Sequence, residues 1–145
     1  MRWRFNLFPA YRGTGGWVTY IASDWSEIRV RLPLTWRTRN YVGTLFGGSI
    51  YAAVDPIYMM MLIKLLGPDY VVWDKAATIR FRRPGRSALE ARFVIKPAML
   101  EEIRAELRTT DKIERVLTVD LCSKDGTVHA SVEKTLHVSR AQARP

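Results

Sequence analysis

One stretch of the chain combines residue types that could activate an acyl carbonyl. Gly47 and Gly48 begin a predicted helix, and Asp55 follows within it. Amides at a helix start lack intrahelical partners and lie at the positive end of the helix dipole. The paired glycines could therefore form an anion hole for a carbonyl oxygen that becomes negatively charged. Two helical turns, roughly 10 Å, separate them from Asp55, so an acyl group could lie between the two.

Asp55 and Asn40 are the candidate groups for activating water. A carboxyl in apolar surroundings should have a raised pKa, which would make Asp55 a better general base than a solvated aspartate. Asn40 precedes the glycines and could hold the water that Asp55 deprotonates. Structural alternatives remain open. Asp55 could pair with an arginine at an interface, the glycines could form only a tight turn, and Asn40 could cap its own loop.

Arginine dominates the charge of the chain, which carries 23 Lys+Arg against 14 Asp+Glu, a net charge of +9. Two stretches hold much of this excess: Arg29, Arg31, Arg37 and Arg39, then Arg80, Arg82, Arg83 and Arg86. Because guanidinium binds phosphate in a bidentate way, these side chains could hold a nucleotide, coenzyme A or nucleic acid. They could equally be solvated strand faces. No helix-turn-helix pattern or zinc-finger spacing favours nucleic acid.

Length and composition exclude several classes of protein. A chain of 145 residues with 48% hydrophobic residues is expected to form one domain, residues 1–145, with a core of its own. One cysteine excludes an internal disulfide framework, and with two scattered histidines it argues against a structural zinc site. No secretory signal is visible, and the longest apolar run, residues 50–66, is interrupted by Asp55, Pro56 and Lys64. We expect a cytoplasmic protein without a membrane span.

Hydrophobic periodicity predicts the elements that must position these groups. The expected elements are strands over 17–22 and 28–34, a helix over 49–66, strands over 71–81 and 89–95, a helix over 97–108 and strands over 117–121 and 128–138. The strands are read as three successive hairpins, the last with a turn at residues 124–126. Pro56 should kink the long helix. Residues 1–15 form an N-terminal extension and residues 139–145 a frayed tail. Met59, Met60 and Met61 are assigned to the core rather than to an acyl pocket.

The predicted helix over 49–66 is apolar on nearly every side, which indicates burial all round. A single antiparallel sheet can cover it only by curling around it, which predicts an α+β fold with one long central helix. Part of the helix and one sheet edge would still stay open. Pairing with a second copy, as a homodimer or homotetramer, is therefore expected.

The stretch from Asn40 to Asp55 resembles the active-site signature of hotdog-fold thioesterases of the phenylacetyl-CoA type. That signature has an Asn, then Gly-Thr-Leu-His-Gly-Gly, then an acidic residue seven positions on. Here Asn40, Gly43-Thr44-Leu45, Gly47-Gly48 and Asp55 fall at those spacings, and Phe46 replaces the His. Residues 119–138 resemble the terminal hairpin of the same families. The similarity covers most of residues 16–138 and is strongest to a branch described only as a domain of unknown function.

The resemblance implies hydrolysis of acyl-CoA thioesters at a dimer interface. Asp55 would act as base or nucleophile, Asn40 would position water, and the Gly47 amide would stabilise the oxyanion. Phe46, Gly48, Arg82, Arg83 and Arg86 would bind substrate, with coenzyme A present only as part of the substrate and no other cofactor or metal. Two other functions remain open: binding of acyl-CoA or a hydrophobic acid without turnover, which Phe46 favours, and nucleic-acid binding through the arginines.

Overall fold

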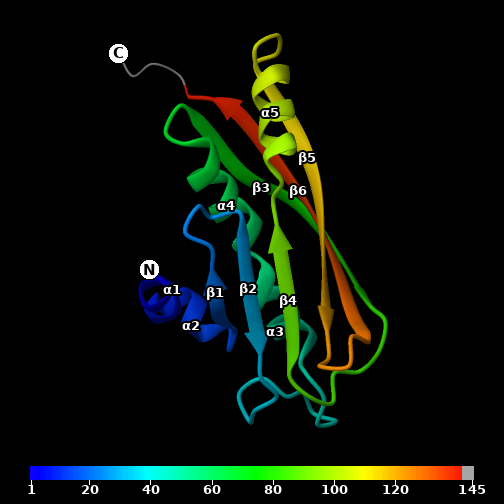
Figure 1. The fold of residues 1–145 in the computed structure, drawn as a ribbon. Coiled ribbons are helices and arrows are strands. Elements are labelled where there is room, and N and C mark those ends of the chain that lie inside the picture. The colour runs from blue at the N-terminus through cyan, green and yellow to red at the C-terminus, as the bar shows by residue number, and fades with distance from the viewer. Residues whose placement is uncertain (142–145) are drawn as a thin grey trace.

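The computed structural model describes residues 1–141, which form one curled antiparallel sheet with helices against its concave face (Figure 1). The strand order is β1-β2-β4-β5-β6-β3. The strands are β1 (Trp17–Ile21), β2 (Glu27–Leu32), β3 (Tyr70–Phe81), β4 (Leu89–Val94), β5 (Lys112–Cys122) and β6 (Val128–Arg140). The helices are α1 (Arg2–Leu7), α2 (Pro9–Gly13), α3 (Gly47–Val54), α4 (Ile57–Leu66) and α5 (Pro97–Glu106).

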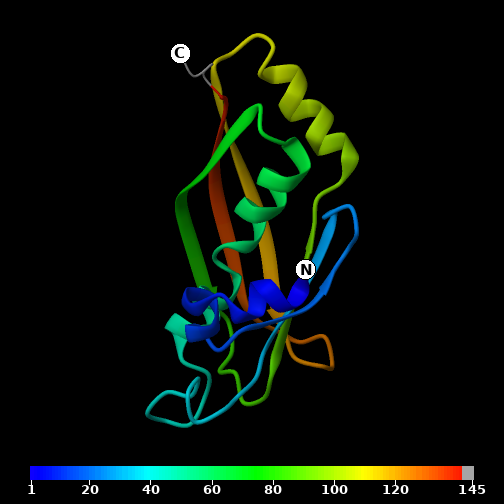
Figure 2. The same ribbon diagram turned by 90° about the vertical axis from the view of Figure 1, so that its left-hand side faces the viewer.

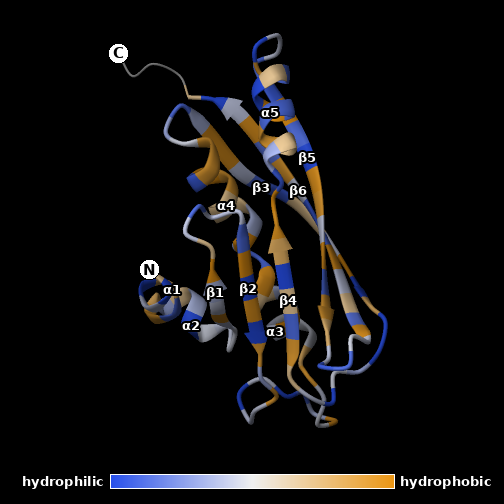
Figure 3. Cartoon of the chain, viewed as in Figure 1, coloured by the Kyte–Doolittle hydropathy of each residue, from blue (hydrophilic) through white to orange (hydrophobic). Residues whose placement is uncertain are grey.

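Alternation along the strands decides which face of the sheet is buried. In β2 the side chains of Ile28, Val30 and Leu32 are buried, and the arginines between them face solvent. The same alternation is visible in β4 (Figure 3). The buried faces pack against α3 and α4, which lie inside the curve of the sheet (Figure 2). The predicted α+β architecture, a sheet wrapped around a central helix, is confirmed.

The central helix agrees with the prediction in one respect and differs from it in another. It is divided, because Asp55 and Pro56 separate α3 from α4, and Pro56 can donate no backbone hydrogen bond to the preceding turn. This confirms the predicted kink. Burial, however, is one-sided: Ile57, Met61 and Leu62 are fully buried, whereas Met59 and Met60 are half-buried and Ile63 is exposed. The stretch Gly47–Leu66 is long and apolar enough to span a membrane, and 44% of its apolar window is buried in the fold.

The expected hairpin of the third and fourth strands is wrong. Strand β3 pairs with β6 and forms one edge of the sheet, while β4 lies between β2 and β5. Residues 82–88 therefore cross from one side of the sheet to the other. The first and last hairpins are confirmed, and the last turns at Gly126 with φ of 85°. The predicted tail begins too early, because β6 continues to Arg140; residues 142–145 lie outside the described part.

The N-terminal extension forms the helices α1 and α2, which pack against the β1 edge and α3. The buried Asn6 amide donates to the Val18 carbonyl at 2.9 Å and accepts from the Val18 amide at 2.8 Å. Tyr11 donates to the carbonyl of Ala53 at 2.9 Å. These contacts replace a neighbouring strand at the β1 edge and attach the extension to the central helix.

Replacing Asn6 by Ala should lower the free energy of unfolding by about 1–3 kcal/mol, because two buried backbone groups of Val18 would lose their partners. Urea unfolding measures the change. Arg4→Ala, on the same helix but exposed, is the matched control. Equal stability of the two variants would show that Asn6 does not hold the extension in place.

Candidate active site

The helix break places the Asp55 carboxylate beside a buried lysine. Lys134 projects from β6 into the core and is only 1% exposed. Its ammonium lies 2.5 Å from Asp55 Oδ1 and 3.2 Å from Asp74 Oδ1, so one cation lies between two carboxylates. Tyr51, one helical turn before Asp55, donates its hydroxyl to the same Asp55 oxygen at 2.6 Å. We call Tyr51, Asp55, Asp74 and Lys134 the buried charge cluster.

Charge and burial act in opposite directions within the cluster. Burial raises the pKa of Asp55, but the hydrogen bonds from Lys134 and Tyr51 outweigh it, so the net pKa of Asp55 is lowered. The predicted raised pKa of Asp55 is therefore wrong. Burial raises the pKa of Asp74 and prevails there over the attraction of Lys134. For Lys134, burial lowers the pKa, yet the bonds to Asp55 and Tyr51 leave the net pKa raised.

In both Asp55 and Asp74, one carboxylate oxygen accepts no hydrogen bond from the described residues. Asp55 Oδ2 accepts no hydrogen bond from the described residues, and the Asp55 side chain is 43% exposed. Asp74 Oδ1 is buried without a well-aligned hydrogen bond in the described part of the chain and is held there by the charge of Lys134. Asp55 thus offers an ionised, oriented and accessible oxygen at neutral pH.

An apolar groove of about 430 Å³ opens beside Asp55, between the N-terminal helices and the central helix. It is lined by Phe5, Phe8, Ala10, Tyr11, Thr14, Ala52, Asp55, Pro56, Met59 and Met60. The assignment of the methionines to the core is correct for Met61, which is fully buried, and for Met59, which packs against the core while also lining the groove. Met60 is half-buried and lines the groove. The volume of the groove is within the range of small-molecule sites, and Asp55 provides a carboxylate on the wall of the groove.

The start of α3 opens into a different cavity, of about 380 Å³, lined in part by Asn40, Gly47, Arg82 and Arg83. Among residues 1–141, the Gly47 and Gly48 amides donate no hydrogen bond. A Cβ at Gly47 would lie 2.9 Å from the Phe81 ring, and one at Gly48 would lie 2.6 Å from the Phe46 ring. A side chain at either position would have to displace an exposed aromatic ring, so packing favours glycine at both positions, in addition to any role of their amides.

Asn40 holds its own loop together. Its Oδ1 accepts from the amides of Val42 and Thr44, at 3.1 and 3.0 Å, and its Nδ2 donates to Thr44 Oγ1 at 2.8 Å. This is the structural alternative left open by the sequence. A role for Asn40 in positioning water stays a prediction.

The substrate-binding candidates are distributed around the same end of the molecule. Arg82 and Arg83 line the cavity of Gly47, whereas Arg86 is exposed outside it. Arg82 Nε also donates to Ser131 Oγ at 2.8 Å. Phe46, which replaces the signature histidine, is 55% exposed and covers Gly48. Within a single chain, Asp55 and Gly47 therefore line different cavities, and Arg82 and Arg83 line the one that contains Gly47.

Sequence reasoning missed Lys134, Tyr51 and Asp74. One signal was present: Ala130, Val132, Leu136 and Val138 share the inward face of β6, and Lys134 occupies the same face in their midst. A cation in an inward register requires a carboxylate partner, because an isolated buried charge is costly. Asp74 carried no comparable signal, since a β-bulge between Asp74 and Ala76 changes its register.

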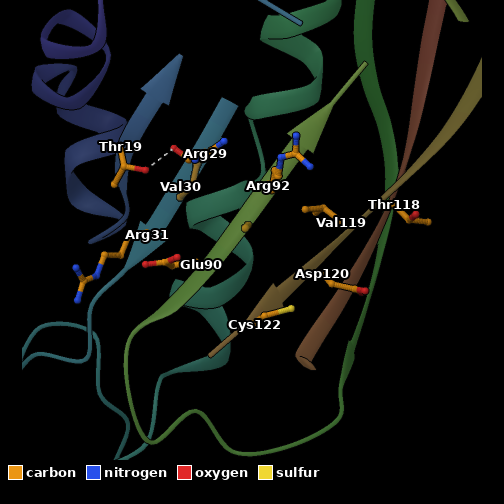
Figure 4. Close-up of a pocket in the computed structure, with 11 residues that line it drawn as sticks. Thr19, Arg29, Val30, Arg31, Glu90, Arg92, Thr118, Val119, Asp120 and Cys122 are labelled. Carbon is orange, nitrogen blue, oxygen red and sulfur yellow. Dashed lines mark hydrogen bonds between the residues drawn. The ribbon is translucent and has the colours of Figure 1, made fainter. Parts of the chain in front are cut away.

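A further concavity on the outer face of the sheet lies where β4 and β5 separate (Figure 4). Its volume is about 670 Å³. Its charges are largely paired, because Arg29 and Arg92 both bind Glu27, which lowers the Glu27 pKa to about 2. On the inner side Tyr58 donates to the Thr118 carbonyl at 2.7 Å and fills the gap in the sheet. The free thiol of Cys122 also lines this concavity, but burial raises the pKa of that thiol, which makes it a poor nucleophile. We therefore interpret the concavity as structural.

Solved structures establish the class of fold. A protein of unknown function from Pseudomonas aeruginosa, described as a probable thioesterase, superimposes with a TM-score of 0.84 at 17% identity, over 97% of this chain and 93% of that one. A thioesterase from Haemophilus influenzae matches with a TM-score of 0.70 at 18% identity, over 98% and 91%. A candidate thioesterase from Shewanella oneidensis gives 0.66 at 25% identity, over 95% and 93%. The chain has the hotdog fold.

The family follows from the sequence itself. Residues 3–138 match the model of the family described as Domain of unknown function (DUF4442), and the protein belongs to this family. A search of curated proteins gave no match. The predicted resemblance to a hotdog branch described as a domain of unknown function is confirmed.

Replacing Lys134 by Met should lower the free energy of unfolding by about 3 kcal/mol, because two neighbouring carboxylates would lose their shared cation. The value lies at the low end for buried pairs, since Asp55 is half-exposed. Urea unfolding at neutral pH measures it. Lys75→Met, which removes the exposed Lys75–Glu114 pair, should cost less than about 1 kcal/mol. A similar loss of unfolding free energy in both variants would contradict a stabilising role for the buried charge cluster.

Proposed function

We propose that this protein hydrolyses acyl-CoA thioesters, with Asp55 as the group that activates water. The observation that carries the proposal is the ionised Asp55 carboxylate on the wall of an apolar groove, with one oxygen held by Lys134 and Tyr51 and the other free. Such a group is fixed in direction and charged at neutral pH. The fold it occupies is that of proteins named as thioesterases.

In the proposed step, the free oxygen of Asp55 accepts a proton from water while the water oxygen attacks the thioester carbonyl carbon. The carbonyl oxygen becomes an oxyanion, which the unpaired Gly47 amide would stabilise. The carbon–sulfur bond then breaks, and the leaving thiolate takes up a proton. Because Lys134 lowers the pKa of Asp55, this carboxylate is a weaker base than the sequence predicted. Direct attack by Asp55 as nucleophile remains the second form of the mechanism.

The apolar groove beside Asp55 would hold the acyl group. Apart from Asp55, its lining is mainly aromatic and aliphatic, with Met59 and Met60 on the helix side. Methionine side chains adapt to irregular apolar ligands at low cost. A hydrocarbon or aryl acyl group would therefore be bound with its thioester carbonyl near Asp55.

A second copy would bring Asp55 and Gly47 into one site. Strand β3 is an edge strand that contributes Asp74 to the buried charge cluster and ends at Phe81, which packs against Gly47. Antiparallel pairing of two β3 edges about Ala77 would place the beginning of one strand against the end of the other. Asp55 of one copy would then face the Gly47 cavity of its partner. The exposed Trp73 and Phe81 would be covered by the same pairing.

Coenzyme A would approach through the Gly47 cavity. Arg82 and Arg83 on its rim could hold phosphate groups in the bidentate manner of guanidinium. Arg86 lies outside this cavity and would contribute, if at all, through its charge on the surrounding surface.

Thiol release from a chain-length series of acyl-CoAs tests the function. Asp55→Asn should lower kcat by about 10²–10⁴-fold, because the group that removes the proton is lost. Asp111→Asn, an exposed aspartate, should leave it unchanged. Binding of acyl-CoA without release of thiol by the unmodified protein would indicate a binding protein, and unaltered turnover by Asp55→Asn would remove the mechanism.

Ala52→Trp should fill the groove and change acyl preference. We expect kcat/KM for long or aromatic acyl-CoAs to fall about tenfold or more, with acetyl-CoA affected least, because only the larger groups need the groove. Ala98→Trp on the exposed face of α5 is the matched control. An equal loss for short and long substrates would place the acyl group elsewhere.

A further inference from the structure

The loop between β2 and α3, residues 33–46, has the polarity of a surface loop reversed. Its threonines Thr38 and Thr44 are buried, at 1% and 8% exposure. Leu34 and Leu45 pack toward the core, but three other large apolar side chains point outward: Trp36 is 79% exposed, Val42 is 75% exposed and Tyr41 is fully exposed. A loop in water normally has the opposite arrangement. Contiguous exposed apolar side chains indicate a surface that another phase or partner covers.

Polar bonds inside the loop hold it in this reversed form. Thr38 donates its hydroxyl to the Pro33 carbonyl at 2.6 Å, and the Phe46 amide donates to the Thr38 carbonyl at 2.8 Å. Asn40 adds the bonds to Val42 and Thr44 described above. The aromatic side chains take no part in this network. The loop backbone is therefore held by its polar groups, while these apolar side chains stay exposed.

Basic side chains surround the exposed apolar ones. The Leu45 amide donates to the Gly85 carbonyl at 2.8 Å, which joins the loop to residues 82–88 at the same end of the molecule (Figure 2). Arg37 and Arg39 are exposed on the first loop, and Arg83 and Arg86 on the second. The Arg37 guanidinium lies 5.9 Å from the centre of the Trp36 ring. We call residues 33–46 and 82–88 together the loop end.

Acidic side chains are nearly absent from this end. Residues 28–54 and 75–89 contain no Asp or Glu. The neighbouring β5–β6 turn contributes Lys124 and Asp125, and the Asp125 carboxylate is bound to Ser123 and the Thr127 amide. The loop end therefore presents an excess of positive charge, interspersed with exposed aromatic and aliphatic side chains, and Glu90 at the start of β4 is the nearest exposed carboxylate in sequence.

We propose that the loop end binds the surface of an anionic lipid membrane. Tryptophan and tyrosine favour the headgroup region of a bilayer, and arginines nearby are attracted to anionic headgroups. Val42 and the rings of Trp36 and Tyr41 would enter the interface while the arginines contact phosphate. A second copy fits less well, because two such ends would bring like charges together. Both loops lie at one end of the molecule, beyond the ends of β2 and β4, where a planar surface can approach them (Figure 1).

Sedimentation with lipid vesicles tests the proposal. The unmodified protein should pellet with vesicles of equimolar phosphatidylcholine and phosphatidylglycerol, and much less with pure phosphatidylcholine. The triple variant Trp36→Ala, Tyr41→Ala, Val42→Ser should lose binding through the lost apolar contacts. Arg86→Glu should weaken binding by about fivefold or more, and added salt should weaken it further. Arg108→Glu, the same charge change beyond α5 at the opposite end, should bind as the unmodified protein does.

The controls separate this proposal from its competitors. Failure of the unmodified protein to bind anionic vesicles, or full binding by the triple variant, would overturn it. Binding of a single-stranded oligonucleotide that the same variants abolish, without vesicle binding, would overturn it in favour of nucleic acid. Hydrolysis of a soluble short-chain acyl-CoA without vesicles should be unchanged in the triple variant, so membrane binding and the proposed activity can fail independently. Unaltered thermal unfolding shows that the variants are folded.

Discussion

The buried ammonium of Lys134 is the contact on which the site depends. It joins β6 to the helix break through Asp55 and to the edge strand through Asp74. A lysine in this position would be strongly unfavourable alone, so its presence requires both carboxylates to stay near it. The cluster thus fixes the position of the helix break relative to the sheet. It also determines which Asp55 oxygen is occupied and which is free.

The proline after Asp55 has a structural and a chemical consequence. By ending α3, Pro56 allows the helix to change direction, and Asp55 lies at the point of change with its side chain between the charge cluster and the apolar groove. The N-terminal helices close the opposite wall of that groove through Phe5 and Tyr11. An element that extends the fold beyond the wrapped sheet therefore contributes directly to the space available for a ligand.

Local pattern was sufficient for most elements and for the helix break at Asp55 and Pro56, and insufficient for what depends on distant contacts. Alternation identified β2 and β6, and Pro56 marked the helix break. The pairing of β3 with β6 could not be read from neighbouring residues, because residues 82–88 resemble a hairpin connection. The pKa of Asp55 was predicted in the wrong direction because Lys134 lies far away in the sequence. Its inward register was a usable signal that a carboxylate partner existed.

The pKa of Asp55, measured by NMR titration of its side-chain carboxyl carbon, tests the central claim most directly. The account predicts a pKa below the ordinary value of 3.8 in the unmodified protein. It also predicts an upward shift once Lys134 is replaced by Met, since burial would then act without the opposing charge. A pKa of Asp55 at or above the ordinary value in the unmodified protein would contradict the account. So would a pKa that does not respond to the loss of Lys134.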